Sequence, residues 1–96
     1  MGIRWSPETQ PPKLTLGEWL CIVRARAGIS RKELGADLGV SGALVSQWEA
    51  DDSLPNVEQF RDITELCAAH WLWEAVKDGD VCMGPEAKEV RARQHT

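Results

Sequence analysis

Apolar residues near the start of the chain recur with the period of an α-helix. Between residues 16 and 27 they are spaced i, i+3, i+4, i+7 and i+11, which places them in one stripe along a helix. The stripe consists of Leu16, Trp19, Leu20, Val23 and Ala27. Thr15 precedes it, Glu18 follows three residues later as in a capping box, and Gly28 stands where helices commonly end. The pattern therefore predicts a helix over about 16–27.

Two shorter helices are predicted next, joined by a tight turn. Ser30 and Glu33 form a second capping pair, and Gly39 ends the helix that they begin. Ser41 then caps a third helix. The turn between the two helices is centred on Gly39 and Val40, and glycine permits the left-handed backbone conformation that such a turn needs.

Apolar residues also indicate how the third helix is seated. Val45 and Trp48 lie on one of its faces, together with Val40 from the turn. Gly35 is small where the second and third helices must approach each other. Two short helices joined in this way have the helix-turn-helix geometry, in which the second helix can enter the major groove of DNA.

The second half of the chain is also helical in pattern. Asn56 caps a predicted fourth helix that runs through Phe60 and Cys67, and residues 70–76 form a short fifth helix rich in tryptophan. Residues 84–94 are mostly polar, so a last turn or two of helix and a frayed end both remain open. No segment combines β-branched alternation with hairpin turns. The predicted fold class is all-α.

Composition divides the chain into three parts. Residues 1–13 carry three prolines and no apolar period, which is typical of a flexible arm. Residues 14–79 form the predicted domain, and residues 80–96 a C-terminal tail that is partly helical at most. Ninety-six residues suffice for a single small domain.

Charge is unevenly distributed along the chain. The net charge of −4 disfavours a nucleic-acid partner. However, residues 19–32 carry four basic residues and no acid, whereas residues 49–80 carry nine acids against two bases. The basic residues are Arg24, Arg26, Arg31 and Lys32. A basic patch can thus exist within an acidic total, although Arg24 and Arg26 fit a solvated helix face equally well.

Other chemistry finds little support in the sequence. Three cysteines without a close pair fit a reducing compartment, and Cys67 with His70 forms at most half of a metal site. No nucleophile–base pair or glycine-rich phosphate loop points to an enzyme, and no apolar run is long enough to span a membrane. We therefore expect a cytoplasmic protein without catalysis, cofactor or metal.

Several of these features occur together in a known family. Leu38-Gly39, the sequence VSQWE at 45–49, the proline at 55 and the Trp-Leu-Trp at 71–73 stand in order and at matching intervals. In these features the chain resembles the lambda-repressor/Cro-type helix-turn-helix proteins, or XRE family, from about residue 16 to residue 76. The resemblance implies a five-helix lambda-repressor-like DNA-binding domain.

The resemblance also implies roles for particular residues. Arg31 and Lys32 would contact phosphates, and Ser41 would cap the recognition helix and offer its hydroxyl to a phosphate. The positions that face the bases in relatives are held here by Gly42, Ala43, Ser46 and Gln47. Gln47 could bind adenine through two hydrogen bonds.

The chain departs from the family pattern at two places. Gly42 has no side chain, and Ala43 offers only a methyl group, suited to thymine. The loop after the recognition helix, often basic in relatives, holds Asp51 and Asp52, which we expect to be solvated. With so few side chains to read bases, specificity would depend on dimer spacing and DNA shape.

Two functions of different classes follow. The first is a sequence-specific transcriptional regulator, a small phage/Cro-like or antitoxin-like repressor that binds a palindromic site on double-stranded DNA as a homodimer. Leu72, Trp73 and Val76 are the candidate dimer contacts, because the fifth helix carries more apolar surface than a small core covers. The second is a protein-interaction module that uses the same scaffold to bind another regulator or RNA polymerase.

Overall fold

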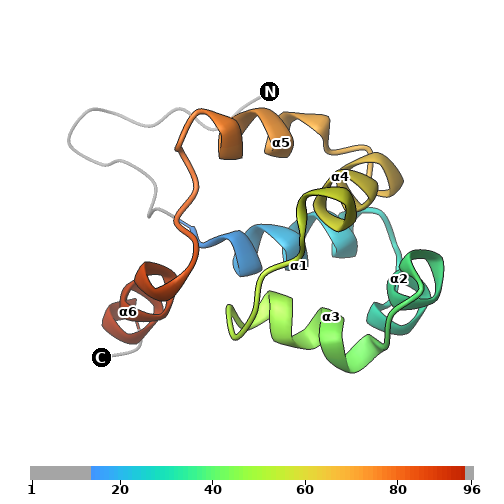
Figure 1. Cartoon of the computed structure of the whole chain (residues 1–96), viewed down its shortest axis with the longest axis horizontal. Coiled ribbons are helices and arrows are strands. Elements are labelled where there is room, and N and C mark those ends of the chain that lie inside the picture. The colour runs from blue at the N-terminus through green and yellow to red at the C-terminus, as the bar shows by residue number, and fades with distance from the viewer. Residues whose placement is uncertain (1–13, 95–96) are drawn as a thin grey trace.

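The computed structural model describes residues 14–94, so the predicted arm at 1–13 lies outside the described residues. Within this part of the chain six helices follow one another (Figure 1): α1 Leu16–Arg26, α2 Arg31–Leu38, α3 Gly42–Glu49, α4 Val57–Leu66, α5 His70–Lys77 and α6 Pro85–Gln94. The described residues contain no strand beyond one isolated bridge between Thr15 and Cys82. The predicted all-α fold class is confirmed.

Helix boundaries follow the local capping chemistry. The side chains of Thr15, Ser30 and Asn56 each accept a hydrogen bond from the backbone N–H of the third residue of their helix. The side-chain oxygen of that third residue in turn accepts a hydrogen bond from the backbone N–H of the cap residue. These reciprocal bonds satisfy backbone N–H groups that the first turn leaves free. Gly28 and Gly39 adopt φ values of 73° and 75° after α1 and at the end of α2, a conformation that favours glycine.

The core lies between the first five helices, α1 to α5. Leu34, Val45, Ile63 and Leu72 are each at most 1% exposed. Partly buried side chains from the same helices, Trp19 and Trp73 among them, pack around this centre. Ala27, predicted to belong to the apolar stripe of α1, is exposed instead: α1 ends at Arg26, Ala27 is its C-cap, and Val23 is the last residue of the stripe that is buried.

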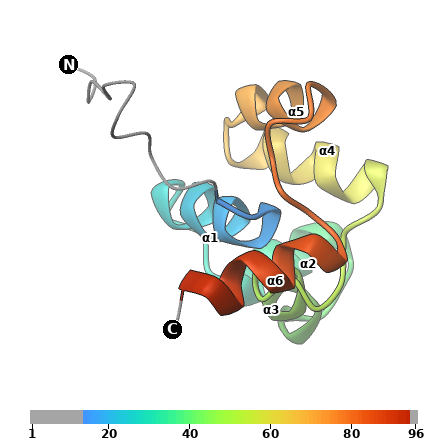
Figure 2. The same cartoon turned by 90° about the vertical axis from the view of Figure 1, so that its left-hand side faces the viewer.

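The helices place α3 and α5 on opposite sides of the molecule. Figures 1 and 2 both show α3 at one edge, α5 at the other, and α1 and α4 between them. This arrangement leaves one side of α3 free of other helices and keeps it far from the surface of α5.

Residues 81–94 pack against the domain. The Leu16 N–H donates to the Cys82 carbonyl over 2.7 Å, and Val81 and Cys82 are buried. Ala87 anchors α6 with no exposed surface. The segment expected to be a tail thus contains a ten-residue helix that lies beside the end of α3 (Figures 1 and 2). Within residues 14–94 no helix is long and apolar enough to cross a membrane.

Candidate nucleic-acid interface

The turn between α2 and α3 requires close backbone approach. A Cβ atom on Gly35 would lie 2.6 Å from the Val40 carbonyl oxygen, so this position in α2 accommodates only glycine without a shift of the turn. The sequence correctly indicated a close approach at Gly35, but the contact is with the turn rather than with α3 itself. Gly39 then reverses the chain in the left-handed region.

The inner and outer sides of α3 differ sharply in exposure. Val45 and Trp48 are 1% and 2% exposed and fix the helix against α1 and α2. Four residues spaced i, i+3, i+4 and i+7 are exposed on the opposite side and form what we term the outer face of α3: Ala43, Ser46, Gln47 and Ala50. Ala50 follows the helix as its C-cap and was not among the predicted site residues.

The first turns of α2 and α3 bring four predicted site residues together. Ser41 caps α3 by accepting a hydrogen bond from the Leu44 N–H over 3.1 Å, and it remains exposed. A Cβ atom on Gly42 would lie 3.4 Å from backbone atoms of Lys32. The side-chain direction at Gly42 therefore points to α2 and not outward, so Gly42 contributes backbone at this site. Arg31 and Lys32 are both exposed beside it.

A buried carboxylate joins three helices next to this site. Glu49, 6% exposed, accepts hydrogen bonds from the Arg24 Nε–H over 2.5 Å and from the Arg31 Nε–H over 2.8 Å. Burial raises the pKa of the Glu49 carboxyl, but the hydrogen bonds from the two arginines outweigh it and lower that pKa overall. The hydrogen bond to Glu49 in turn raises the pKa of Arg24.

The Glu49 cluster was not predicted. In the sequence Glu49 opens an acidic stretch, and nothing local distinguishes it from its solvated neighbours. Its consequence for the site is direct: Arg31, 51% exposed, is held at one nitrogen by Glu49 while it stands at the surface of α2.

The residues that form this site fall within the part of the chain that matches a known protein family. A family model described as a helix-turn-helix domain matches residues 15–70, more than half of the chain. The chain belongs to the helix-turn-helix domain family. No curated protein and no solved structure matches it. Membership supports DNA binding as the general activity of this helix-turn-helix protein.

The expectation of a solvated Asp51 is wrong. Asp51 is 7% exposed, adopts φ 61°, and accepts hydrogen bonds from the Thr15 hydroxyl over 2.5 Å and the Gly17 N–H over 2.8 Å. A carboxylate at the N-terminus of α1 is favourable because it faces unpaired N–H groups and the positive end of the helix dipole. Asp51 therefore holds the helix-turn-helix to α1. Asp52 remains exposed, with a salt bridge to Lys88 of α6.

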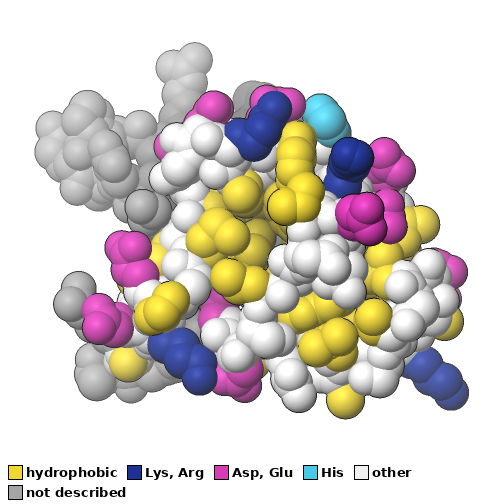
Figure 3. All heavy atoms as spheres, viewed as in Figure 1, with side chains coloured by type: hydrophobic (Ala, Val, Ile, Leu, Met, Phe, Trp, Pro, Cys, Tyr) yellow, Lys and Arg dark blue, Asp and Glu magenta, His cyan; other side chains and the backbone are white. Residues whose placement is uncertain are grey.

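The candidate dimer residues divide in two. Leu72 is completely buried, so its assignment as a dimer contact is wrong: it faces the core from the inner side of α5. Trp73 and Val76 are partly exposed, and the Trp73 ring lies 5.6 Å from that of Phe60. Together with Val57 and Met83 they line a shallow apolar hollow of about 170 Å³. Figure 3 shows hydrophobic side chains gathered on this side of the molecule, between α5 and α1.

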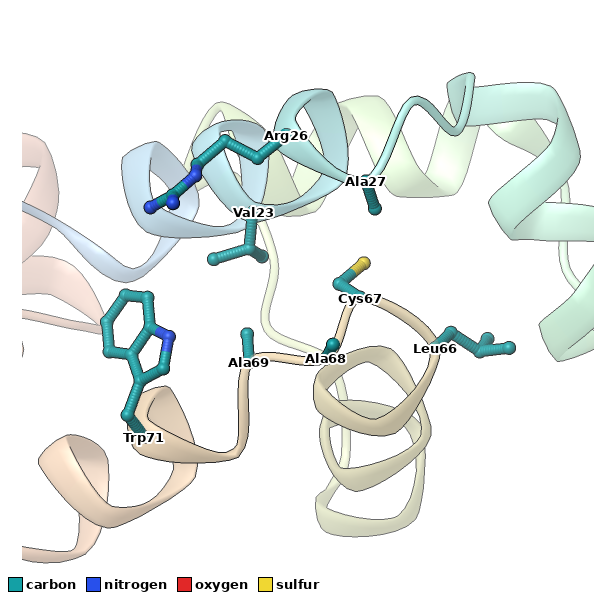
Figure 4. A pocket seen from close by; sticks show the side chains of 8 residues that line it. All are labelled: Val23, Arg26, Ala27, Leu66, Cys67, Ala68, Ala69 and Trp71. Atoms are coloured by element: carbon teal, nitrogen blue, oxygen red, sulfur yellow. The ribbon is translucent and has the colours of Figure 1, made fainter.

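A second hollow, of about 330 Å³, lies between the end of α1 and the junction of α4 and α5. Figure 4 shows Val23 and Ala27 facing Cys67 across it. Burial raises the pKa of the Cys67 thiol. His70 is exposed and pairs with Glu74, and the described residues hold no cluster of three or more metal-binding side chains.

Proposed function

We propose that the chain is a sequence-specific, DNA-binding transcriptional regulator of the lambda-repressor/Cro type, a small repressor that binds without catalysis. One observation carries this proposal. The outer face of α3 projects from an edge of the molecule with Gln47 exposed, while Val45 and Trp48 seat the helix rigidly. A seated helix with a free polar face is the element that enters a major groove.

The site residues divide into base-reading and backbone-binding groups. Gln47 would bind adenine, Ser46 would reach a neighbouring base, and the Ala43 methyl would contact thymine. The phosphate contacts would come from the first turns of α2 and α3, where Arg31, Lys32, the Ser41 hydroxyl and the Gly42 backbone meet. Such a complex would cover a promoter and block its use.

A homodimer on a palindromic site completes the proposal. Two recognition helices must face the same side of the duplex, about 34 Å apart. The apolar hollow lined by Val57, Trp73, Val76 and Met83 lies between the edge that carries α3 and the edge that carries α5 (Figures 1 and 3). If the two-fold axis runs along the direction from α5 to α3, pairing two copies through this lateral surface leaves both α3 helices pointing in one direction, whereas pairing through the outer edge of α5 would point them apart.

One observation favours the alternative of a protein-interaction module that binds another regulator or RNA polymerase. Glu49 pairs with both Arg24 and Arg31, so the basic segment 19–32 is partly neutralised within the fold. A weakly basic surface with a short, neutral outer face would suit a protein partner as well as a groove.

Selection of bound sequences from random duplex DNA, at several stated salt concentrations, tests the proposal. We expect a palindromic consensus and an affinity that falls with salt by about 0.9 in log units per phosphate neutralised and per decade of salt. Gln47→Ala should mainly blunt the preference between sites, by about 1–3 kcal/mol at one base pair. Arg31→Ala should weaken binding to every sequence and reduce the salt slope.

Arg61→Ala is the control for Arg31→Ala, because it removes the same charge from an exposed position on α4. It should leave both the affinity and the slope near those of the parent protein. An affinity for duplex DNA that does not change with salt and is not reduced by Gln47→Ala or Arg31→Ala would favour the protein-interaction module.

A further inference from the structure

The position of α6 beside the end of α3 is fixed by buried contacts. The Leu16–Cys82 hydrogen bond holds the preceding segment, and Ala87, with no exposed surface, holds the first turn of α6 itself. Lys88 follows Ala87 directly. Its backbone is therefore held in place next to the loop that leaves α3.

Lys88 is connected to the outer face of α3 by a short chain of contacts. Its Nζ lies 2.8 Å from Oδ1 of Asp52. The Asp52 N–H donates to the Gln47 carbonyl over 2.9 Å. Lys88 is thus linked through Asp52 to the backbone of Gln47, the residue proposed to read bases.

The ion pair itself is exposed. The Lys88 and Asp52 side chains are 59% and 54% exposed. Exposed pairs of this kind contribute only about 0–1 kcal/mol, so such a pair opens readily when a stronger partner is present. A duplex is such a partner, because each phosphate that a lysine neutralises releases condensed counterions.

We propose that Lys88 is a DNA-backbone contact contributed by α6, which exchanges the Asp52 carboxylate for a phosphate when α3 enters the groove. The loop 50–56 contains no basic residue that could serve at this end of α3. The proposal rests on the proposed function and adds to it a second contact region, at the opposite end of α3 from Arg31, Lys32 and Ser41.

The competing explanation is that Lys88 merely neutralises Asp52. The two explanations agree on Lys88→Gln, which weakens binding in both. They differ for the double variant Asp52→Asn with Lys88→Gln, whose net charge equals that of the parent protein. If Lys88 only neutralises, the double variant binds like the parent. If Lys88 contacts a phosphate, the contact is still missing.

The experiment measures the affinity for one duplex between 50 and 300 mM salt for the parent, both single variants and the double variant. For Lys88→Gln and for the double variant we expect the slope of log K against log salt to fall in magnitude by about 0.9 per bound subunit. For Asp52→Asn we expect the slope to be kept and the affinity to rise up to about fivefold, since Lys88 no longer has to leave a carboxylate.

Arg61→Gln is the matched control. Arg61 is exposed on α4, and it belongs neither to the proposed DNA-contacting residues nor to the hollow proposed for dimerisation. It should keep the parental slope, and sedimentation of each variant shows whether the oligomeric state of the parent is retained.

A double variant with the parental slope would overturn the Lys88 proposal while the proposed function stands. An Arg61→Gln slope reduced as much as that of Lys88→Gln would overturn it too, because the effect would then belong to net charge and not to position. A parent protein whose duplex binding does not depend on salt would remove the proposed function and this inference together.

Discussion

Replacing Glu49 by glutamine should destabilise the fold, and the loss should come mainly through Arg24. The Arg24 side chain is 12% exposed, whereas that of Arg31 is 51% exposed. Removing one partner of a buried pair costs about 3–5 kcal/mol, because the other charge stays buried without compensation. Glutamine keeps one acceptor oxygen at nearly the same place, so we expect a loss near the lower end, about 3 kcal/mol.

The same reasoning assigns different values to the two arginines. Arg24→Gln should cost about 3 kcal/mol, since it leaves Glu49 buried and held only by Arg31. Arg31→Gln should cost less than about 1 kcal/mol, because its half-exposed guanidinium is screened by water. Against a total stability of about 5–15 kcal/mol for a small domain, the first loss is large and the second small. Urea titration at pH 7 measures each value.

The pH dependence of stability provides a second readout. Because the folded pKa of Glu49 is lowered, its contribution is fully present above the ordinary carboxyl pKa of 4.5 and disappears as the pH falls through the folded value. The difference in unfolding free energy between the parent protein and Glu49→Gln should therefore be constant above about pH 5 and should shrink at lower pH.

Two results would refute this reasoning. One is an Arg31→Gln variant at least as destabilised as Arg24→Gln, since burial would then not decide the strength of the pair. The other is a stability difference for Glu49→Gln that stays unchanged from pH 7 down to pH 2, since Glu49 would then not carry the charge that the arginines hold.

Four further changes probe packing and the proposed dimer surface. Gly17→Ala should destabilise the protein by more than about 2 kcal/mol, because its Cβ would lie 2.6 Å from the carbonyl oxygens of Trp48 and Glu49. Gly42→Ala should be nearly neutral, because the nearest contact of its Cβ would be at 3.4 Å. Thermal unfolding compares the stabilities of the two variants. Leu72→Ala should cost about 2–5 kcal/mol in urea titration as a cavity in the core. Val57→Asp, at a residue 64% exposed, should leave stability almost unchanged and shift the species seen in sedimentation to monomer, and a dimer that persists would contradict the proposed lateral surface.

Much of the fold could be predicted because its signals are local. The capping boxes at Thr15 and Ser30, and the glycines that end α1 and α2, specify helix ends through bonds within a few residues. The burial of Val45 and Trp48 on one side of α3 likewise follows from helical periodicity. Leu72 could not be separated from Val76 in this way, because both lie on an apolar helix whose neighbours decide which side is covered.

The polar residues of the α3 end show where local signals stop. Glu49, Asp51 and Asp52 stand within four positions in the sequence and look alike as a solvated acidic run. In the structure, Glu49 binds two arginines, Asp51 caps α1, and only Asp52 faces solvent, with Lys88 from α6 as its partner. Each partner lies more than 15 residues away in the chain, so no spacing rule could assign it.

The sequence by itself determined the first five helices, most of their ends and the exposed side of α3, because periodicity and capping act over one or two turns and need no knowledge of distant segments. Only the tertiary structure decided what each charge does, which face of α5 is covered, and that residues 85–94 pack as a helix beside α3. Those outcomes depend on which groups from remote parts of the chain come within hydrogen-bond distance. Burial then makes one carboxylate an internal cap and leaves its neighbour at the surface.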